Sequence, residues 1–142
     1  MICVIGGGAA GFFAAINAAS QGCKVTILEK GSKVLSKVRI SGGGRCNVTN
    51  GVATLQGLLD GYPRGQKELR GPFTKFSNQD TMNWFKDRGV RLKVEKDGRV
   101  FPVSDDSGSI IDCLLDEAHR LGVEIKLGFS VESISTSQSG FI

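Results

Sequence analysis

The chain has 142 residues, of which 40% are apolar and 23% are charged, and its formal net charge is +4. This composition is typical of a single globular domain and argues against a disordered chain. No apolar run approaches the roughly 18 residues that a membrane span needs, and no signal or transit peptide is recognisable. We therefore expect no membrane partner, and a cytoplasmic protein or, if upstream sequence is absent, one of an organellar stroma or matrix.

The first predicted elements are a buried parallel strand over residues 1–5, a glycine-rich turn and a helix over residues 9–21. The turn matches the pattern G-x-G-x-x-G at Gly6, Gly8 and Gly11. In a dinucleotide-binding turn, the first glycine allows the tight turn, the second lets the backbone approach a pyrophosphate, and the third lets the helix pack on the strand. The helix N-terminus would offer free N–H groups to the same pyrophosphate.

A second strand is predicted over residues 24–28, and Glu29 stands at its end. A carboxylate in this position can accept hydrogen bonds from a ribose 2′-hydroxyl and argues against a 2′-phosphate. A glycine turn with a purely structural role is the alternative. The complete order of strand, turn, helix, strand and acid favours nucleotide binding.

The segment that follows Glu29 is basic and contains no acid as far as Arg45. Its positive residues are Lys30, Lys33, Lys37, Arg39 and Arg45. Such a segment is either a solvated loop or a positive rim for an anionic ligand, and its position after Glu29 favours the rim. Aromatic residues do not interleave with these charges, so a small-molecule ligand is expected and nucleic acid is not.

A second glycine-rich stretch spans residues 40–50, in a region of little regular periodicity. It is not a Walker loop, because no Gly-Lys-Ser/Thr follows at the required spacing. Its composition indicates either backbone laid against a ligand or a flexible surface loop, and leaves both open. Cys46 beside Arg45 could be a thiol of lowered pKa. However, the four cysteines form no C-x-x-C pair, which favours a packing role for Cys46, a reducing compartment and no metal site.

The middle of the chain is predicted to hold a short helix near residues 55–59, ended by Tyr62-Pro63. A longer helix follows, capped by Ser77 with Asp80 in its first turn, and runs to about residue 88. Both helices belong to the part of the chain that lies after the second glycine-rich stretch.

Strands over residues 90–95 and 99–103 form a predicted hairpin. Ser104 would cap the next helix, which has an apolar stripe at helical spacing. His119 falls in the last turn of that helix and is expected to be a favourable C-terminal charge rather than a catalytic base. A core strand over residues 123–127 follows.

The end of the chain carries a predicted strand over residues 130–134, a polar turn over residues 135–140 and an apolar restart at residues 141–142. This pattern opens a hairpin without closing it. We therefore expect the chain to be the N-terminal part of a longer protein.

Several of these motifs together resemble the BaiN/YhiN family of FAD/NAD(P)-dependent oxidoreductases, which are aminoacetone oxidase-like FAD-binding flavoproteins. The resemblance covers nearly the whole chain and rests on residues 4–11, 28–30 and 98–104, on Lys37, and on the string SGGGRCNVTN over residues 41–50. That string is much more specific than the dinucleotide fingerprint and favours ligand contact for the second glycine-rich stretch. The family usually carries a Lys-Ala pair where this chain has Asp106-Ser107, and this departure argues against a ligand role at that helix start.

The resemblance implies FAD rather than NAD in the first site, with Glu29 on the adenosine ribose and the second glycine-rich stretch near the flavin. NAD(P)H is a candidate electron donor, and no catalytic acid or base is assigned. The cofactor-binding residues that it implies are Gly6, Gly8, Ala9, Ala10, Gly11, Glu29, Lys30, Lys37, Ser41, Gly42, Gly43, Gly44, Arg45, Cys46 and Asn47.

The predicted fold class is α/β, with a mainly parallel Rossmann-type sheet and a small antiparallel excursion around residues 91–103. The chain would be the N-terminal part of an FAD-binding domain whose inserted substrate domain and C-terminal return segment are absent, so we do not expect it to hold flavin tightly alone. The predicted function is the FAD-binding portion of a flavin-dependent oxidoreductase acting on an unidentified small substrate. The alternatives are an NAD-dependent dehydrogenase that uses only the first fingerprint, and a non-catalytic truncated nucleotide-binding module.

Overall fold

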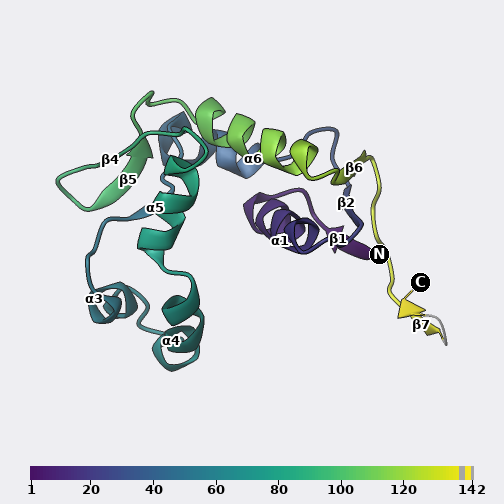
Figure 1. Cartoon of the computed structure of the whole chain (residues 1–142), viewed down its shortest axis with the longest axis horizontal. Helices are drawn as coiled ribbons and strands as arrows, with labels where there is room; N and C mark the ends of the chain where they lie inside the picture. The colour runs from purple at the N-terminus through teal and green to yellow at the C-terminus, as the bar shows by residue number, and fades with distance from the viewer. Residues whose placement is uncertain (138–139, 142) are drawn as a thin grey trace. The chain divides into compact units, whose positions relative to one another are not determined.

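The computed structural model describes residues 1–137 and 140–141 (Figure 1). The chain divides into two compact units, each with its own three-stranded sheet. The first unit comprises Met1–Lys37 and Leu114–Ile142, and the second comprises Val38–Cys113.

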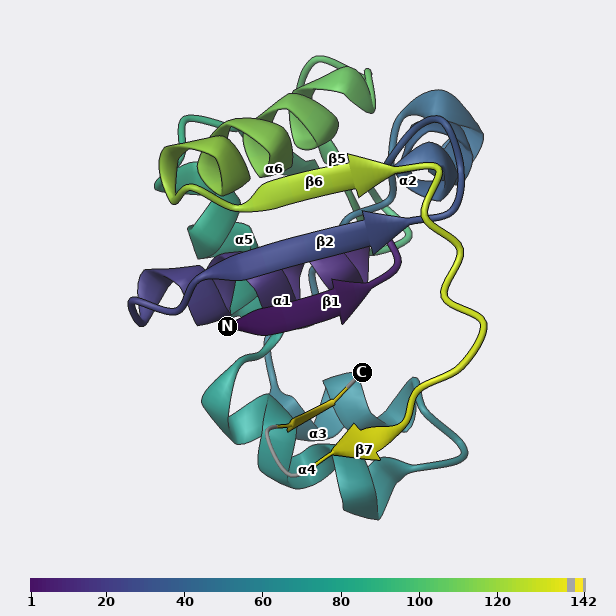
Figure 2. The same ribbon diagram turned by 90° about the vertical axis from the view of Figure 1, so that its right-hand side faces the viewer.

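A parallel sheet organises the first unit. Its strands β1 (Ile2–Ile5), β2 (Val25–Glu29) and β6 (Glu124–Leu127) lie in the order β1-β2-β6. Figure 2 shows the three strands running in the same direction, with helix α1 (Ala9–Ser20) beside β1 and β2. Ile27, in the middle of β2, lies opposite Val4 on one side and Ile125 on the other. This arrangement confirms the predicted α/β fold of the Rossmann type.

The core of the first unit lies between α1 and the sheet. Phe12, Ala15, Ile16 and Ala19 are buried and recur at helical spacing on one face of α1. Ile27 is fully buried in β2. Complete burial of an apolar side chain such as Phe12 or Ile27 stabilises a fold by about 1.5–3 kcal/mol. This packing holds the start of α1 against the end of β1, where the first glycine turn lies.

The sequence predicts a buried first strand, and this prediction is wrong. β1 is the outer strand of the described sheet, and its residues Ile2 and Ile5 are 38% and 54% exposed. Among the described residues, no strand pairs with the free edge of β1. Its apolar side chains therefore have no neighbouring strand to pack against on that side.

The end of the chain also differs from the prediction. Residues 130–134 form no strand, and Ile134 is 61% exposed. The described strands here are β7 (Thr136–Ser137) and β8 (Gly140–Phe141), which pair antiparallel. The predicted polar turn falls partly on residues 138–139, and these and Ile142 lie outside the described residues. A short alternating pattern needs a neighbouring strand to bury its apolar face, and the described residues supply none for residues 130–134.

An antiparallel sheet organises the second unit and confirms the predicted antiparallel excursion. Strands β3 (Thr49–Asn50), β4 (Leu92–Val94) and β5 (Arg99–Pro102) lie in the order β3-β5-β4. The predicted hairpin between β4 and β5 is present, and both strands are shorter than expected. Val100 and Phe101 of the central strand are fully buried.

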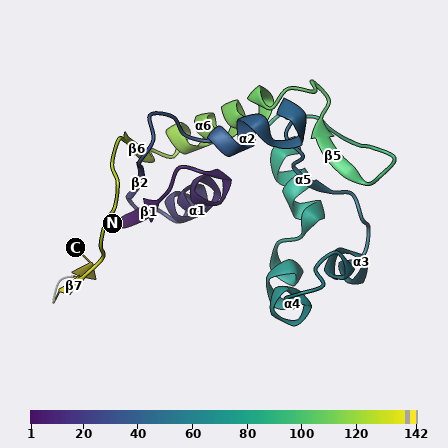
Figure 3. The ribbon, with the colours of Figure 1, turned by 180° about the vertical axis from the view of Figure 1, so that it is seen from behind.

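Three helices lie between β3 and β4, and one of them was not predicted. The short helix α3 (Leu55–Asp60) was expected, whereas α4 (Gln66–Lys75) was not, because it contains Gly71 and Pro72, two poor helix formers. Figures 1 and 3 show α3 and α4 side by side. Helix α5 (Asn78–Lys86) begins where it was expected.

The start of α5 shows the predicted capping in full. The Ser77 hydroxyl accepts a hydrogen bond from the Asp80 N–H, and the Asp80 carboxylate accepts one from the Ser77 N–H at 2.8 Å. This reciprocal pair is a capping box, which satisfies two of the N–H groups that a helix start leaves free.

The last helix, α6 (Gly108–Arg120), begins four residues later than Ser104, the predicted cap. Asp105 adopts a left-handed backbone conformation with φ of 54°, which interrupts a helix at that point. The Asp106 carboxylate then accepts a hydrogen bond from the Gly108 N–H at 2.8 Å. The expected apolar stripe is confirmed, because Ile110, Ile111, Leu114 and Ala118 are buried. Among the helices that the structure describes, none combines the length and the apolar character needed to cross a membrane.

Candidate functional site

The first glycine turn joins β1 to α1 and brings the helix very close to the chain before it. A Cβ atom on Gly11 would lie 2.0 Å from the Gly6 carbonyl oxygen, so only glycine fits there. This confirms the close packing predicted for Gly11. A Cβ atom on Gly8 would meet nothing within 4 Å, so the space beside Gly8 is open. Gly8 is the N-cap of α1 and has no side chain to cap the helix.

The N-terminus of α1 therefore presents donors without acceptors. The N–H groups of Ala9, Ala10 and Gly11 donate to no acceptor within residues 1–137 and 140–141, and Ala9 and Ala10 are exposed. A helix start with free N–H groups and no acid in its first turn favours an anion. The turn can thus receive a phosphate group without losing a bond it already has.

Glu29, at the end of β2, holds this turn in place. One carboxylate oxygen accepts the Gly7 N–H at 2.8 Å, and the other accepts the Gly31 N–H at 2.7 Å. These two bonds, with a smaller contribution from the Lys30 charge, lower the pKa of Glu29 below its ordinary value of 4.5. Each carboxylate oxygen has a second lone pair, so the group can still accept bonds from a ligand.

Gly7 is a site residue that the sequence reasoning missed. Besides donating to Glu29, it lies under Val34, whose Cγ1 would be 2.6 Å from a Cβ atom on Gly7. Its carbonyl accepts the Leu35 N–H at 2.8 Å. The uninterrupted run of three glycines, where the fingerprint requires only two, is the signal that could have identified it.

Three lysines of the predicted positive rim belong to the first unit. Lys30, Lys33 and Lys37 are exposed, and none forms an ion pair in the part of the chain that the structure describes. Because none of them is held in an ion pair, these three lysines can contribute positive charge to a rim for an anionic ligand. Arg39 and Arg45 belong to the second unit.

The second glycine-rich stretch has a defined backbone rather than that of a flexible loop. Helix α2 (Ser36–Ile40) leads into a 3₁₀ turn (Ser41–Gly44), which the sequence did not predict. Gly42 has a φ of 56°, and a Cβ atom there would lie 2.7 Å from the Asn47 nitrogen and 2.8 Å from the Phe101 ring. Gly43 and Gly44 also have positive φ. The Asn47 amide, oriented by its hydrogen bonds, donates to the Thr49 carbonyl at 3.0 Å.

Arg45 anchors this stretch to the β4–β5 hairpin. Its Nη1 donates to Glu95 at 2.6 Å and to Asp105 at 3.3 Å, and its guanidinium lies 3.9 Å from the centre of the Phe101 ring. These acids raise the pKa of Arg45, and Asp105 is shared with Lys93. The expectation that Arg45 adds free charge to the positive rim is therefore wrong, because two carboxylates compensate it.

Cys46 is not an activated thiol, although its position beside Arg45 suggested one. Its side chain is buried, and this burial raises the pKa of the thiol, with a weaker opposing effect from the Ser41 hydroxyl. The packing role, which the sequence favoured, is the one the structure supports. Among the described residues, no group of three or more His, Cys, Asp or Glu side chains is arranged to hold a metal ion.

We expect Cys46 to react slowly with a thiol reagent in the native protein, because the thiolate is the reactive form and burial disfavours it. Cys3 and Cys23 are exposed and should react first, whereas Cys113 is buried like Cys46. The measurement is the time course of labelling with a chromogenic disulfide at neutral pH, with a denatured sample as the control for all four thiols. Loss of a fast-reacting equivalent in Cys46→Ser would contradict this account.

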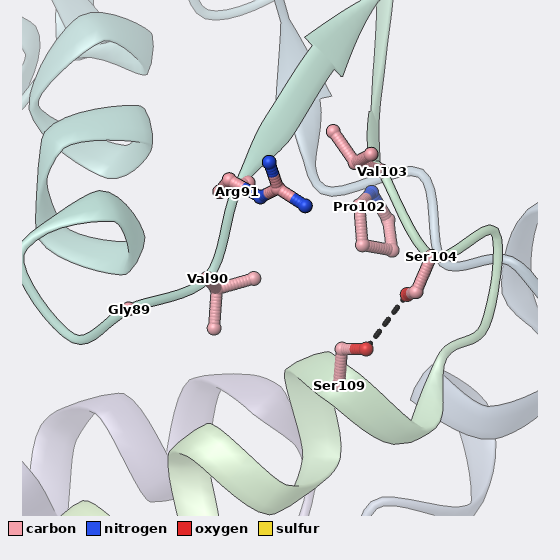
Figure 4. Close-up of a pocket in the computed structure, with 7 residues that line it drawn as sticks. All are labelled: Gly89, Val90, Arg91, Pro102, Val103, Ser104 and Ser109. Atoms are coloured by element: carbon pink, nitrogen blue, oxygen red, sulfur yellow. Dashed lines mark hydrogen bonds between the residues drawn. The ribbon is translucent and has the colours of Figure 1, made fainter.

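A pocket in the second unit was not anticipated from the sequence. Figure 4 shows it between the start of β4, the end of β5 and the first turn of α6. Its volume is about 370 Å³. The Ser104 and Ser109 hydroxyls form a 2.7 Å hydrogen bond on one wall, and Arg91 lies on the other. The lining residues are Gly89, Val90, Arg91, Pro102, Val103, Ser104 and Ser109.

A parallel sheet, a glycine turn opening on a helix with free N–H groups, and an acid at the end of the second strand define a dinucleotide-binding domain of the Rossmann type. The chain belongs to the family described as HI0933-like protein Rossmann domain, whose model matches residues 1–142. This is the BaiN/YhiN family of FAD-binding flavoproteins, and the resemblance stated from the motifs is confirmed.

Two curated relatives are similar over almost the whole chain. Ribosomal RNA dihydrouridine synthase of Escherichia coli K12 is 32% identical over 138 residues, which are 97% of this chain and 34% of the relative. The 3-dehydro-bile acid delta(4,6)-reductase of Clostridium scindens is 34% identical over 141 residues, or 98% and 34% of the two chains. The chain thus spans about one third of the length of these relatives.

Solved structures show the same fold at low sequence identity. The 3-ketosteroid-delta4-(5alpha)-dehydrogenase of Rhodococcus jostii RHA1 has a TM-score of 0.69 at 18% identity, with 97% of this chain and 39% of that chain covered. A flavocytochrome c3 fumarate reductase has a TM-score of 0.62 at 22% identity, with 96% and 28% covered.

Proposed function

We propose that this chain is the FAD-binding portion of a flavin-dependent oxidoreductase. The observation that carries the proposal is the α1 N-terminus, where the unsatisfied N–H groups of Ala9, Ala10 and Gly11 adjoin the open space beside Gly8. These groups would bind the diphosphate, and Lys30 and Lys37 would balance its charge. Glu29 would accept the ribose hydroxyls with the lone pairs that Gly7 and Gly31 leave free.

The second glycine-rich stretch would contribute the flavin contacts. This part of the proposal rests on the family resemblance of the string over residues 41–50, and on the left-handed backbone at Gly42, Gly43 and Gly44. Three successive residues without side chains let a planar ligand approach the backbone closely. Arg45 would act as a positioning residue, because its guanidinium is held by Glu95 and Asp105 and ties the stretch to the hairpin.

The chemistry of the whole protein is also a proposal. When bound, FAD supplies two-electron transfer, and the chain supplies binding, orientation and exclusion of water. The names of two relatives describe adding hydrogen to an unsaturated ring, in a uridine of ribosomal RNA and in a bile acid. We infer reduction of a ring carbon–carbon double bond as the reaction class, in which a hydride and a proton add across the bond. NAD(P)H is the candidate donor of the electrons.

A titration of the purified chain with FAD and, separately, with NAD⁺ tests this proposal. We expect saturable binding of both, because both contain the ADP group, and tighter binding of FAD if the second glycine-rich stretch contacts the flavin. Weak FAD affinity is compatible with the proposal, because further residues of a longer protein would complete the flavin site. NAD⁺ binding more tightly than FAD would favour the alternative of an NAD-dependent dehydrogenase, and binding of neither would contradict the proposal.

A further inference from the structure

We propose that one face of α4, together with the turn before it, is a docking surface for single-stranded RNA. We call it the α4 face and define it by Tyr62, Arg64, Lys67 and Arg70. The inference deepens the proposed function, because it names RNA as the class of macromolecule that carries the substrate. All of its residues belong to the second unit, whereas the residues assigned to the diphosphate belong to the first.

The cations of the α4 face are concentrated on one side of the helix. At about 100° per residue, Lys67, Arg70 and Thr74 fall within about 60° of one another, and Arg64 precedes Lys67 by one turn. Glu68, the one acid in α4, falls on another side of the helix. Leu69 and Phe73, which fall about 40° from each other around the helix, are more buried than these cations.

These cations keep their charge available for a partner. Arg64 and Lys67 are exposed and form no ion pair among residues 1–137 and 140–141. Arg70 donates to the neutral Gln56 amide oxygen at 2.9 Å, so its charge is not compensated. The Gln56 amide nitrogen donates to Asp60 at 2.8 Å, so a neutral side chain separates this acid from Arg70.

An exposed aromatic ring adjoins these cations in the sequence. Tyr62 is 41% exposed, and its ring is held against Phe73 of α4 with the ring centres 5.4 Å apart. An exposed ring beside cations is typical of a site for single-stranded nucleic acid, because a base stacks on the ring while the cations bind the phosphates.

Two arguments favour RNA as the partner of the α4 face: its phosphates complement the cations of this face, and two relatives are named for a modification of ribosomal RNA. Curated relatives from Escherichia coli and Haemophilus influenzae are both named ribosomal RNA dihydrouridine synthase. This proposal departs from the expectation, drawn from residues 30–45, that nucleic acid is not a partner. That expectation rested on the lack of aromatic residues among those charges, and the α4 face includes the exposed ring of Tyr62.

Fluorescence anisotropy with a labelled single-stranded RNA of about 12 nucleotides tests the proposal, because such a length spans a typical groove. We compare the wild-type chain with Lys67→Glu/Arg70→Glu and with the matched control Lys86→Glu/Lys96→Glu, which makes the same change in net charge at exposed positions of the second unit. We expect the first variant to bind about tenfold or more weakly, with a shallower dependence on salt, and the control to bind like the wild type. Equal loss in both variants would overturn the proposal.

Two further measurements make the test specific. Tyr62→Leu retains an apolar contact with Phe73 but removes the stacking ring, so it should weaken RNA binding without changing the salt dependence. FAD affinity should be unchanged in all variants, which separates failure of this surface from failure of the proposed function. Binding of anionic phosphatidylserine vesicles, with no RNA binding and the same loss in Lys67→Glu/Arg70→Glu, would assign the surface to lipid and overturn the proposal.

Discussion

Gly11→Ala is expected to lower the free energy of unfolding by about 1–3 kcal/mol, the usual cost of forcing extra atoms into a packed site. The added methyl group would stand 2.0 Å from the Gly6 carbonyl oxygen. Because that oxygen belongs to the backbone, it cannot be moved by a side-chain rotation. The N-terminus of α1 must therefore move away from the turn. FAD binding should fall with it, because the free N–H groups no longer point at the diphosphate.

The chain offers a matched control in Gly71→Ala. Gly71 also lies inside a helix, but a Cβ atom there meets nothing within 4 Å apart from its chain neighbours. Alanine is the better helix former, whereas the ring of the following Pro72 disfavours a Cβ atom in the helical conformation at this position. Because these two effects oppose each other, this variant should change the free energy of unfolding by less than about 1 kcal/mol. Urea unfolding of the two variants measures the difference. If both substitutions stabilised the protein, the close approach of α1 to the first glycine turn would be incorrect.

Glu29→Gln is expected to weaken FAD binding about tenfold to a hundredfold, because neutral hydrogen bonds replace charge-assisted ones. The structure adds a second effect. Glutamine has one oxygen, so its NH₂ group would face the N–H of either Gly7 or Gly31, both of which now donate to the carboxylate. The turn should therefore loosen even without ligand. Isothermal titration measures the affinity, and Glu68→Gln, an exposed site with the same charge change, is the control.

The contribution of the Glu29 carboxylate to the free energy of unfolding depends on pH in a predictable direction. The pKa of Glu29 lies below its ordinary value of 4.5 in the folded chain, so the folded state binds fewer protons than the unfolded state near that pH. The stability that the carboxylate contributes is complete above pH 4.5 and is lost as the pH falls through the folded pKa. The difference in unfolding free energy between wild type and Glu29→Gln should shrink in acid. A difference that grew in acid would show that the carboxylate does not brace the turn.

The first glycine turn was predictable because its signals are local. The strand, the three fingerprint glycines and the acid at the end of the second strand lie within residues 1–29, and each has one mechanical role. The capping of α5 was predictable for the same reason, since Ser77 and Asp80 are three residues apart. Motif resemblance supplied the family, and the ligand contact that it implies for residues 41–50 stays a prediction.

The roles of Arg45 and Cys46 depend on residues far away in the sequence. Glu95 and Asp105, which bind Arg45, follow it by 50 and 60 residues. A contact between residues so far apart leaves no periodic pattern in the sequence from which it could be predicted. Burial of Cys46 likewise depends on tertiary packing. Helix α4 was missed because packing overrides the poor propensity of Gly71 and Pro72. The late start of α6 follows from the left-handed backbone at Asp105. This conformation cannot be predicted from the Asp105-Asp106 sequence.

If the first glycine turn binds the diphosphate of FAD, as we propose, a titration of Gly8→Val with FAD should show no binding. Gly8 has a φ of −89°, which valine can adopt, and a Cβ atom there meets nothing within 4 Å of the chain. The side chain should therefore leave the fold intact and occupy the space of the pyrophosphate. We expect the variant to keep a cooperative unfolding transition and to lose the saturable FAD binding expected for the wild type. FAD affinity equal to that of the wild type in a folded Gly8→Val chain would contradict this proposal.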